Sequence, residues 1–301
     1  MTALRSAADI LDENRITLQS TAFGRHYTTC PQCSTRRRKA NQKLKCLGVT
    51  IEDDGVKFGC NHCQWTGGGF YRAELRAAPT TAVDLAALER TKAKAAERQR
   101  IEIAHSQIKV KRLWAKRQPI EATVERYLRE ARRYAGPLPP TIGFLPATDI
   151  YPPAMIAAFG MARETEPGRL VIDDAAVTGI HITKLKPDGS GKADTEADKL
   201  TIGLGNRSPI WLAPINDGLG LAIAEGIEDA LSVHAATGLG AWAAGTAGRL
   251  PAMADVVPDY VECVTIMVDA DANGEKNSTE LAQRLVARGI EVLMVRPGGD
   301  A

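Results

Sequence analysis

The sequence is poor in aromatic residues and has no long apolar run, and each absence argues against a class of protein. Phe, Tyr and Trp make up 5% of the 301 residues, so we expect no large stacking surface. The chain contains no uninterrupted apolar stretch of the length that a transmembrane helix needs. Its polar start also lacks the apolar region of a secretory signal, so we expect a cytoplasmic protein without a membrane partner.

Charge is unevenly distributed, although the net charge is only +2. Residues 1–117 hold 22 Lys and Arg against 11 Asp and Glu, whereas residues 118–301 hold 16 against 25. A basic first part is typical of a module that contacts nucleic acid, and an acidic second part could hold cations. Well-solvated helices would give the same imbalance.

Four of the six cysteines form two Cys-x-x-Cys pairs, Cys30 with Cys33 and Cys60 with Cys63. In a cytoplasmic chain this spacing predicts a structural zinc site, because each pair presents two thiolates to one tetrahedral ion. A disulfide pair or redox-active thiols are the alternatives. Cys46 and Cys263 stand apart from the pattern.

The segment between the two cysteine pairs predicts a zinc ribbon that contacts nucleic acid. Residues 47–51 and 56–58 are typical of strands joined by the turn at Asp54-Gly55. A basic run could neutralise backbone phosphates, or could be an ordinary solvated loop. Trp65 could stack on an unpaired base, or could cap the small core. The candidate DNA-binding residues are Arg36, Arg37, Arg38, Lys39, Lys43 and Trp65.

The middle of the chain predicts a long helix and then a mixed α/β region. Residues 83–117 contain no Gly or Pro and favour an exposed helical connector, with a coiled coil as the alternative. We expect helices at 123–134 and 154–160, and strands at 170–172, 177–183 and 199–202. Residues 189–193 resemble a phosphate-binding loop but lack its first Gly and its Ser or Thr, so we interpret them as a turn with an exposed Lys.

The final third alternates apolar strands (219–224, 240–244, 264–268 and 290–295) with helices (226–237 and 278–288, the latter capped by Asn277). This pattern predicts a parallel sheet covered on both faces. Carboxylates follow two of the strands: Glu225 and Asp229 after the first, and Asp269 and Asp271 after the third. Such groups repel one another unless a cation such as Mg²⁺ or Mn²⁺ offsets their charge, although each alone could be a turn or cap residue.

Glu225-Gly226-x-x-Asp229 and Val268-Asp269-Ala270-Asp271, each placed after an apolar strand, resemble the Toprim domain of primases, topoisomerases and recombination mediators. With the amino-terminal ribbon, the chain resembles phage and mobile-element primases over most of its length. The resemblance implies an α/β multidomain protein. Its parts would be a zinc ribbon (1–75), a helical linker (76–117), the amino-terminal subdomain of a primase RNA-polymerase core (118–216) and a Toprim domain (217–301).

The resemblance also implies roles for particular residues. Glu225, Asp269 and Asp271 would be catalytic, and together with Asp229 they would hold Mg²⁺ or Mn²⁺. Basic residues of the middle region would bind nucleotide or template, with Lys199 the first candidate, followed by Lys184 and His181. Primases carry a further acidic motif after the next strand; Asp300 would be its first acid, so we expect the Toprim domain to be truncated at Ala301.

The implied activity is synthesis of short RNA primers from NTPs on single-stranded DNA by two-metal nucleotidyl transfer. Because the chain has no complete ATPase motif, we expect the helicase partner to be a separate protein. A Toprim nuclease is an alternative, since the same acids serve phosphodiester hydrolysis. A non-catalytic, RecR-like recombination protein is another, although there the zinc module lies next to Toprim.

Overall fold

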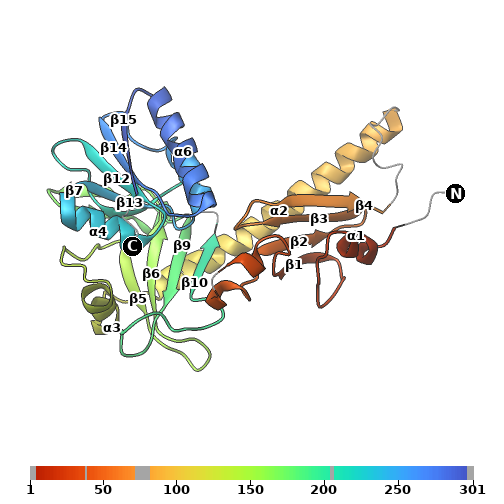
Figure 1. Ribbon diagram of the computed structural model, residues 1–301, viewed down its shortest axis with the longest axis horizontal. Helices are drawn as coiled ribbons and strands as arrows, with labels where there is room; N and C mark the ends of the chain where they lie inside the picture. Colours follow the sequence, from red (N-terminus) through yellow and green to blue (C-terminus); the bar gives the residue numbers. More distant parts are fainter. Residues whose placement is uncertain (1–4, 38, 72–81, 204–206, 297–301) are drawn as a thin grey trace. The chain divides into compact units, whose positions relative to one another are not determined.

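The computed structural model describes residues 5–37, 39–71, 82–203 and 207–296. The chain forms two compact units, residues 1–98 and residues 99–301. Figure 1 shows the helices and strands of each unit. In the described part of the chain, no helix has both the length and the apolar character that crossing a membrane requires.

The amino-terminal unit contains a small antiparallel sheet of four strands. Its strands lie in sequence order and are β1 (Gly24–Thr28), β2 (Leu47–Ile51), β3 (Gly55–Cys60) and β4 (Thr66–Phe70). The predicted strand, turn and strand at 47–58 are confirmed as β2 and β3. The sequence did not reveal β4, because Thr66-Gly-Gly-Gly-Phe70 has no apolar alternation. One helix, α1 (Ala7–Glu13), adds Ile10 and Leu11 to the core of the unit.

The long helix is confirmed as α2 (Ala82–Ala115), but its last part is not an exposed connector. Val110 and Trp114 are almost completely buried among residues of the second unit, including Ile156 and Ile180. The Trp114 indole nitrogen donates a hydrogen bond to Asp174 at 2.9 Å. The end of α2 therefore belongs to the core of the second unit.

The first sheet of the second unit is antiparallel, with strand order β10-β9-β6-β5. Its strands are β5 (Ile142–Leu145), β6 (Ala154–Phe159), β9 (Gly179–Lys184) and β10 (Lys199–Gly203). The expected helix at 154–160 is wrong, because this segment is strand β6. All six residues of β6 are buried: Met155 and Phe159 face one core cluster, and Ile156 faces the cluster that contains Trp114. Burial on both faces outweighs the helical preference of Ala and Met.

A short helical segment precedes this sheet and ends in a π-helical turn. It consists of α3 (Ala122–Arg126) and η4 (Tyr127–Ala131), in good agreement with the expected helix at 123–134. A hairpin of β7 (Arg163–Glu166) and β8 (Arg169–Val171) and the 3-10 turn η5 (Asp174–Ala176) lie between β6 and β9.

The second sheet has strand order β11-β13-β12-β14-β15 and is parallel except for its edge strand β11. Its strands are β11 (Ile210–Ala213), β12 (Gly220–Ala224), β13 (Gly240–Ala243), β14 (Cys263–Met267) and β15 (Glu291–Val295). The sequence predicted the four parallel strands and missed the short antiparallel one. A parallel sheet with one antiparallel edge is common in α/β proteins.

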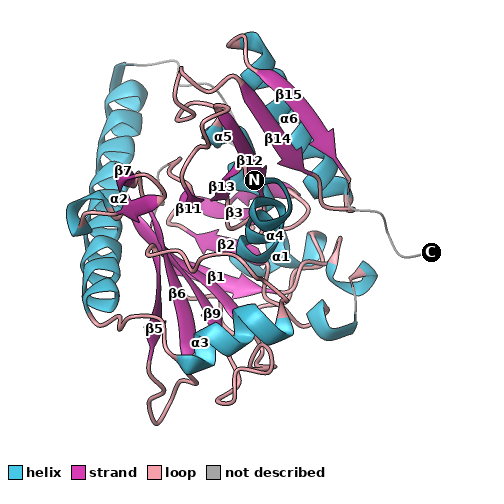
Figure 2. Ribbon diagram, turned by 90° about the vertical axis from the view of Figure 1, so that its left-hand side faces the viewer, coloured by secondary structure: helices cyan, strands magenta, loops and turns pink. Residues whose placement is uncertain are grey.

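Helices cover both faces of the second sheet, as predicted. Helix α4 (Ile227–Thr237) packs on the face that carries Ala224 and Ala243. Helices α5 (Leu250–Met253) and α6 (Ala272–Ala287) share the other core, where Leu281 packs with Ile223 and Ile266. Figure 2 shows α6 running beside β14 and β15. The loop after β13 contains the short 3-10 turn η6 (Ala247–Arg249).

Candidate active site and zinc centre

The acidic site lies at the carboxyl ends of two neighbouring parallel strands, β12 and β14. Glu225 comes directly after β12, and Asp269 comes two residues after β14; the pairing of Ile223 with Ile266 brings these ends to one edge. Burial and the nearby charges of Asp269 and Asp271 raise the pKa of Glu225 to about 7. A hydrogen bond between the Glu225 and Asp269 side chains contributes to the same rise. The sheet therefore holds the two carboxyl groups close together at one edge.

Asp271 has a second task in the structure, because it caps helix α6. One of its carboxylate oxygens accepts hydrogen bonds from the backbone N–H groups of Asn273 (2.9 Å) and Gly274 (2.7 Å). The expected helix start at Ser278, with Asn277 as cap, is wrong, because α6 begins six residues earlier, at Ala272. Asn277 lies inside the helix and donates to the backbone of Asn273. The Asp271 charge is thus stabilised by the positive end of the helix.

Two glycines allow acidic side chains to approach the backbone at this edge. A Cβ atom on Gly226, the residue before α4, would lie 2.4 Å from a carboxylate oxygen of Asp229. A Cβ on Gly274 would lie 2.8 Å from the Cβ of Asp269. Partial desolvation and the charges of Asp269 and Glu228 raise the pKa of Asp229. Asp229 therefore belongs to the same electrostatic cluster as Glu225 and Asp269.

The carboxylates are more widely spread than the cysteines described below. Across the described ranges, the four cysteines are the one group of three or more metal-ligating side chains whose donor atoms all lie within 4.8 Å of one another. The donor chemistry of the acidic site nevertheless fits a hard divalent cation, because Mg²⁺ commonly takes one or two carboxylates together with water and phosphate oxygens. Glu225 and Asp269 are the pair that could hold it, and the raised pKa of Glu225 reflects nearby negative charge that such a cation would offset.

Beside the acids lies a buried ion-pair network centred on Glu228, whose side chain is only 13% exposed. Its carboxylate lies 3.4 Å from the Lys199 ammonium and 3.8 Å from that of Lys192, and accepts a 2.7 Å hydrogen bond from the Tyr127 hydroxyl. Although burial opposes ionisation, Lys199 and the Tyr127 hydrogen bond lower the pKa of Glu228 to about 2. Arg132 completes the network by donating to the Tyr127 oxygen at 3.0 Å.

Of this network, Lys199 was a predicted site residue, whereas no role was predicted for Glu228, Lys192, Tyr127 or Arg132. The glycine-rich segment at 189–193 does form a turn, yet it directs Lys192 toward Glu228. Tyr127 is the first residue of the π-helical turn η4, a feature often found at functional sites. That turn depends on packing against the second sheet, so the residue pattern alone gives no signal for it.

The other two predicted basic residues lie on β9. His181 is 4% exposed, and burial followed by the nearby Lys199 charge lowers its pKa to about 4, so its ring is neutral at pH 7. The ring packs edge-on against Phe159. Lys184 donates to the Thr195 hydroxyl at 3.3 Å, in the connection between β9 and β10.

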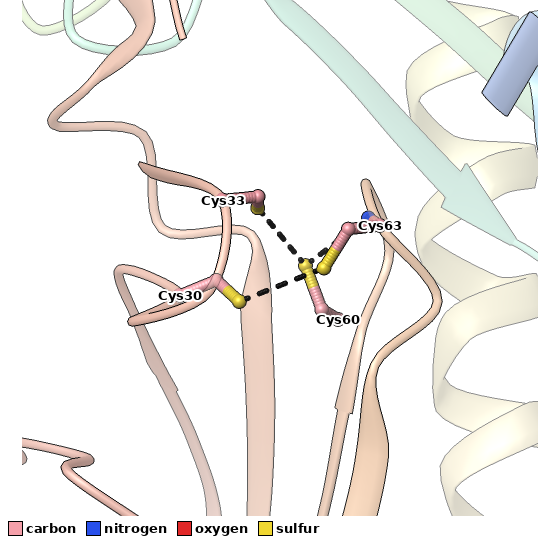
Figure 3. A group of neighbouring side chains, drawn as sticks. All are labelled: Cys30, Cys33, Cys60 and Cys63. Atoms are coloured by element: carbon pink, nitrogen blue, oxygen red, sulfur yellow. Dashed lines mark hydrogen bonds between the residues drawn. The ribbon is translucent and has the colours of Figure 1, made fainter. Parts of the chain in front are cut away.

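The predicted zinc ligands Cys30, Cys33, Cys60 and Cys63 converge in the amino-terminal unit (Figure 3). The Sγ atoms of Cys30 and Cys63 are 3.7 Å apart, as are those of Cys33 and Cys60. A zinc ion with bonds of about 2.3 Å to a sulfur tetrahedron requires sulfur separations of about 3.8 Å. Burial raises the pKa of Cys30 to about 11, so thiolates form here when a cation replaces their protons. The site has the geometry and donors that zinc needs.

The cysteine spacing set Cys46 apart from the metal site, but in the structure Cys46 lies beside it. Its Sγ lies 3.7 Å from that of Cys60 and 4.0 Å from that of Cys33. The cysteine spacing gave no sign of this contact, because it arises from the pairing of β2 with β3.

The predicted DNA-binding residues of the ribbon are only partly exposed. Arg36, Lys39 and Lys43 are exposed, Arg37 is half-buried, and Arg38 lies outside the described residues. Trp65 is also half-buried and packs against Phe58 with the ring centres 4.6 Å apart. Of the two interpretations of Trp65, its packing in the structure fits a cap on the small core.

Comparison with protein families gives two matches. Residues 220–301 match the Toprim domain, and residues 104–212 match a domain of unknown function, DUF7146. The Toprim match at the carboxyl end and the four-cysteine cluster at the amino end are the two features on which the resemblance to primases rests. Asp300 lies in the Toprim match but outside the residues that the structure describes.

Among solved structures, the chain is similar to the crystal structure of the Aquifex aeolicus primase, comprising its zinc-binding and RNA polymerase domains. The sequence identity is 13% and the TM-score is 0.35, over 97% of this chain and 77% of that chain. Comparison with curated proteins gives no match.

Proposed function

We propose that this chain is a primase-type nucleotidyltransferase that makes short RNA primers on single-stranded DNA. The observation that carries the proposal is the contact between Glu225 and Asp269 at adjacent strand ends of a Toprim domain. A buried carboxyl group whose pKa is raised by a neighbouring acid is typical of catalytic sites and of divalent-cation sites. Both residues lie within residues 220–301, the segment that matches the Toprim domain, and this supports the proposal.

Each acidic residue has a distinct part in the proposed reaction. Glu225 and Asp269 would hold Mg²⁺ or Mn²⁺, with Asp229 and Asp271 as further acids around them. When bound, two such ions neutralise the triphosphate and favour attack of a 3′-hydroxyl on the α-phosphate. Glu225, with a pKa of about 7, can exchange a proton near neutral pH when no cation is bound.

The basic side chains beside the acids would receive the nucleotide phosphates. Lys199 and Lys192 hold their ammonium groups within 4 Å of the Glu228 carboxylate, and both side chains remain partly exposed. Glu228 and Tyr127 would keep the two lysines in place, so that little side-chain entropy is lost when a triphosphate binds. His181, which is buried and neutral, would pack in the core beneath the site and would not contact a phosphate.

The ribbon would contact the template. Its exposed basic residues Arg36, Lys39 and Lys43 can neutralise phosphates without reading base sequence. We expect a separate helicase to supply the unwound strand. These assignments can be tested by fluorescence anisotropy with a labelled oligonucleotide: the double variant Arg36→Ala, Lys43→Ala should weaken binding and reduce the dependence on salt. Lys276→Ala, an exposed change on α6, is the matched control.

The decisive experiment is de novo primer synthesis on single-stranded DNA with labelled NTPs and Mg²⁺ or Mn²⁺. We expect short products from the wild type, and at least an approximately 100-fold loss in Glu225→Gln and Asp269→Asn. Glu262→Gln, a change at an exposed acid before β14, should leave the products unchanged. Shortening of the template would instead identify a nuclease. DNA binding without any product, unaffected by the acidic substitutions, would identify a non-catalytic binding protein.

A further inference from the structure

The ribbon contains a fifth thiol, Cys46, that the zinc site does not need. Cys46 lies one residue before β2, and the pairing of Leu47 with Cys60 places it opposite the second cysteine pair. Its backbone carbonyl accepts a 2.9 Å hydrogen bond from the N–H of Asn61, a residue within that pair. The backbone therefore fixes the position of Cys46 beside Cys60 independently of any metal.

The sulfur of Cys46 is in van der Waals contact with a zinc ligand. Its Sγ is 3.7 Å from that of Cys60, the same separation as between the ligands Cys33 and Cys60. Disulfide formation would shorten this distance to about 2 Å. Cys46 is half-buried, whereas Cys60 is buried, so a small oxidant meets Cys46 more readily.

We propose that Cys46 is an oxidation site that converts exposure to a peroxide into release of zinc, by forming a disulfide with Cys60. The inference depends on zinc occupying the four-cysteine site and does not depend on nucleotidyl transfer. Because four thiolates already complete the coordination of zinc, the Cys46 sulfur keeps its lone pairs free to react.

The chemistry balances in two steps. First, the Cys46 thiol gives its proton to water and its sulfur attacks one peroxide oxygen; the S–O bond forms, the O–O bond breaks and hydroxide leaves. Second, the Cys60 sulfur leaves zinc and attacks the oxidised Cys46 sulfur; the S–S bond forms and a second hydroxide leaves. The two sulfurs supply the two electrons that reduce the peroxide. The proton released by Cys46 converts one hydroxide to water, and the buffer protonates the other.

Loss of Cys60 leaves three thiolates at a site that needs four. Zinc affinity falls, and the clamp between the two cysteine pairs opens. Cys60 is also the last residue of β3 and part of the small core, so its displacement disturbs the sheet itself. A thiol reductant and fresh zinc reverse the change, since a disulfide is reducible.

The test uses the full chain loaded with zinc and treated with hydrogen peroxide, with a chromogenic chelator reporting zinc release. Cys46→Ser is compared with the wild type and with Cys263→Ser, the matched control at the cysteine outside the ribbon. We expect zinc release at least about 5-fold slower in Cys46→Ser than in the other two. Mass spectrometry of the oxidised wild type, digested without reductant, should show a peptide pair joined through Cys46 and Cys60.

Equal rates of release in all three proteins would overturn the proposal, as would oxidised wild type in which the disulfides omit Cys46. Zinc content is measured before oxidation, so that folding and reactivity are separated. If Cys46→Ser and Cys46→Ala both fail to bind one zinc per chain, Cys46 is a ligand and the proposal is wrong. Primer synthesis plays no part in these readouts, so a failure here is distinct from a failure of the proposed function.

Discussion

Replacing Glu225 by Gln should stabilise the metal-free protein at pH 8 and have little effect at pH 5. Folding raises the Glu225 pKa from 4.5 to about 7, which means that the folded state disfavours its carboxylate form. Such an acid does not lower the free energy of unfolding below pH 4.5, and it lowers that free energy by the full amount above pH 7. The size of this rise corresponds to about 3 kcal/mol of lost stability at pH 8. Glutamine carries no charge and can still donate a hydrogen bond to Asp269.

The expected change in melting temperature follows from the size of the second unit. For a unit of about 200 residues, 1 kcal/mol shifts the Tm by about 2–4 °C, so the variant should melt about 6–12 °C higher at pH 8. Differential scanning calorimetry in the presence of EDTA, followed for the transition of residues 99–301, measures this. Glu262→Gln is the control at an exposed acid and should leave the Tm unchanged.

A divalent cation provides the complementary measurement. Mg²⁺ at pH 8 should raise the Tm of the wild type more than that of Glu225→Gln, because the cation offsets charge that the variant lacks. The reasoning would be refuted if Glu225→Gln gained no more stability at pH 8 than at pH 5. It would also be refuted if Mg²⁺ stabilised both proteins equally.

Three further predictions concern neighbouring features. Glu228→Gln should show the opposite pH dependence. The pKa of about 2 of Glu228 implies a stabilising contribution that is present above pH 4.5 and declines as the pH falls toward 2. In urea titrations the variant should therefore be less stable than the wild type by about 3 kcal/mol at pH 7, and the difference should be smaller at pH 3. Gly226→Ala should weaken Mn²⁺ binding, measured by calorimetric titration, because its Cβ would displace the Asp229 carboxylate; unchanged binding would exclude Asp229 from the site. Zinc removal by a chelator should abolish the ordered ribbon while residues 99–301 keep their melting transition, as followed by amide hydrogen exchange.

Residue patterns predicted the strands and helices whose burial is periodic or continuous. The β12, β13, β14 and β15 segments are short apolar runs separated by helices, so their order along the chain was enough to predict a parallel sheet. The spacing of the two Cys-x-x-Cys pairs was enough to predict a four-thiolate metal site, and the structure confirms that their sulfurs converge. The acids at the ends of β12 and β14 were found by the same rule of sheet edges.

Other features depend on contacts between segments far apart in the sequence. Ala154–Phe159 forms strand β6 rather than a helix, because cores on both of its faces bury all six residues. Asp271 caps α6, a role that depends on where the chain leaves β14. Helix α6 therefore begins six residues before the predicted start.

The sequence by itself determined the chemistry that the chain can offer: four thiols for one metal, and acids after apolar strands. Only the tertiary structure decided which additional groups join each site. Cys46 reaches the zinc ligands through the register of β2 with β3, and Tyr127 reaches Glu228 across 101 positions of sequence. The physical reason is that local propensity and periodicity act over a few residues. Burial and pairing act between surfaces, and their partners are fixed only when the whole sheet is assembled.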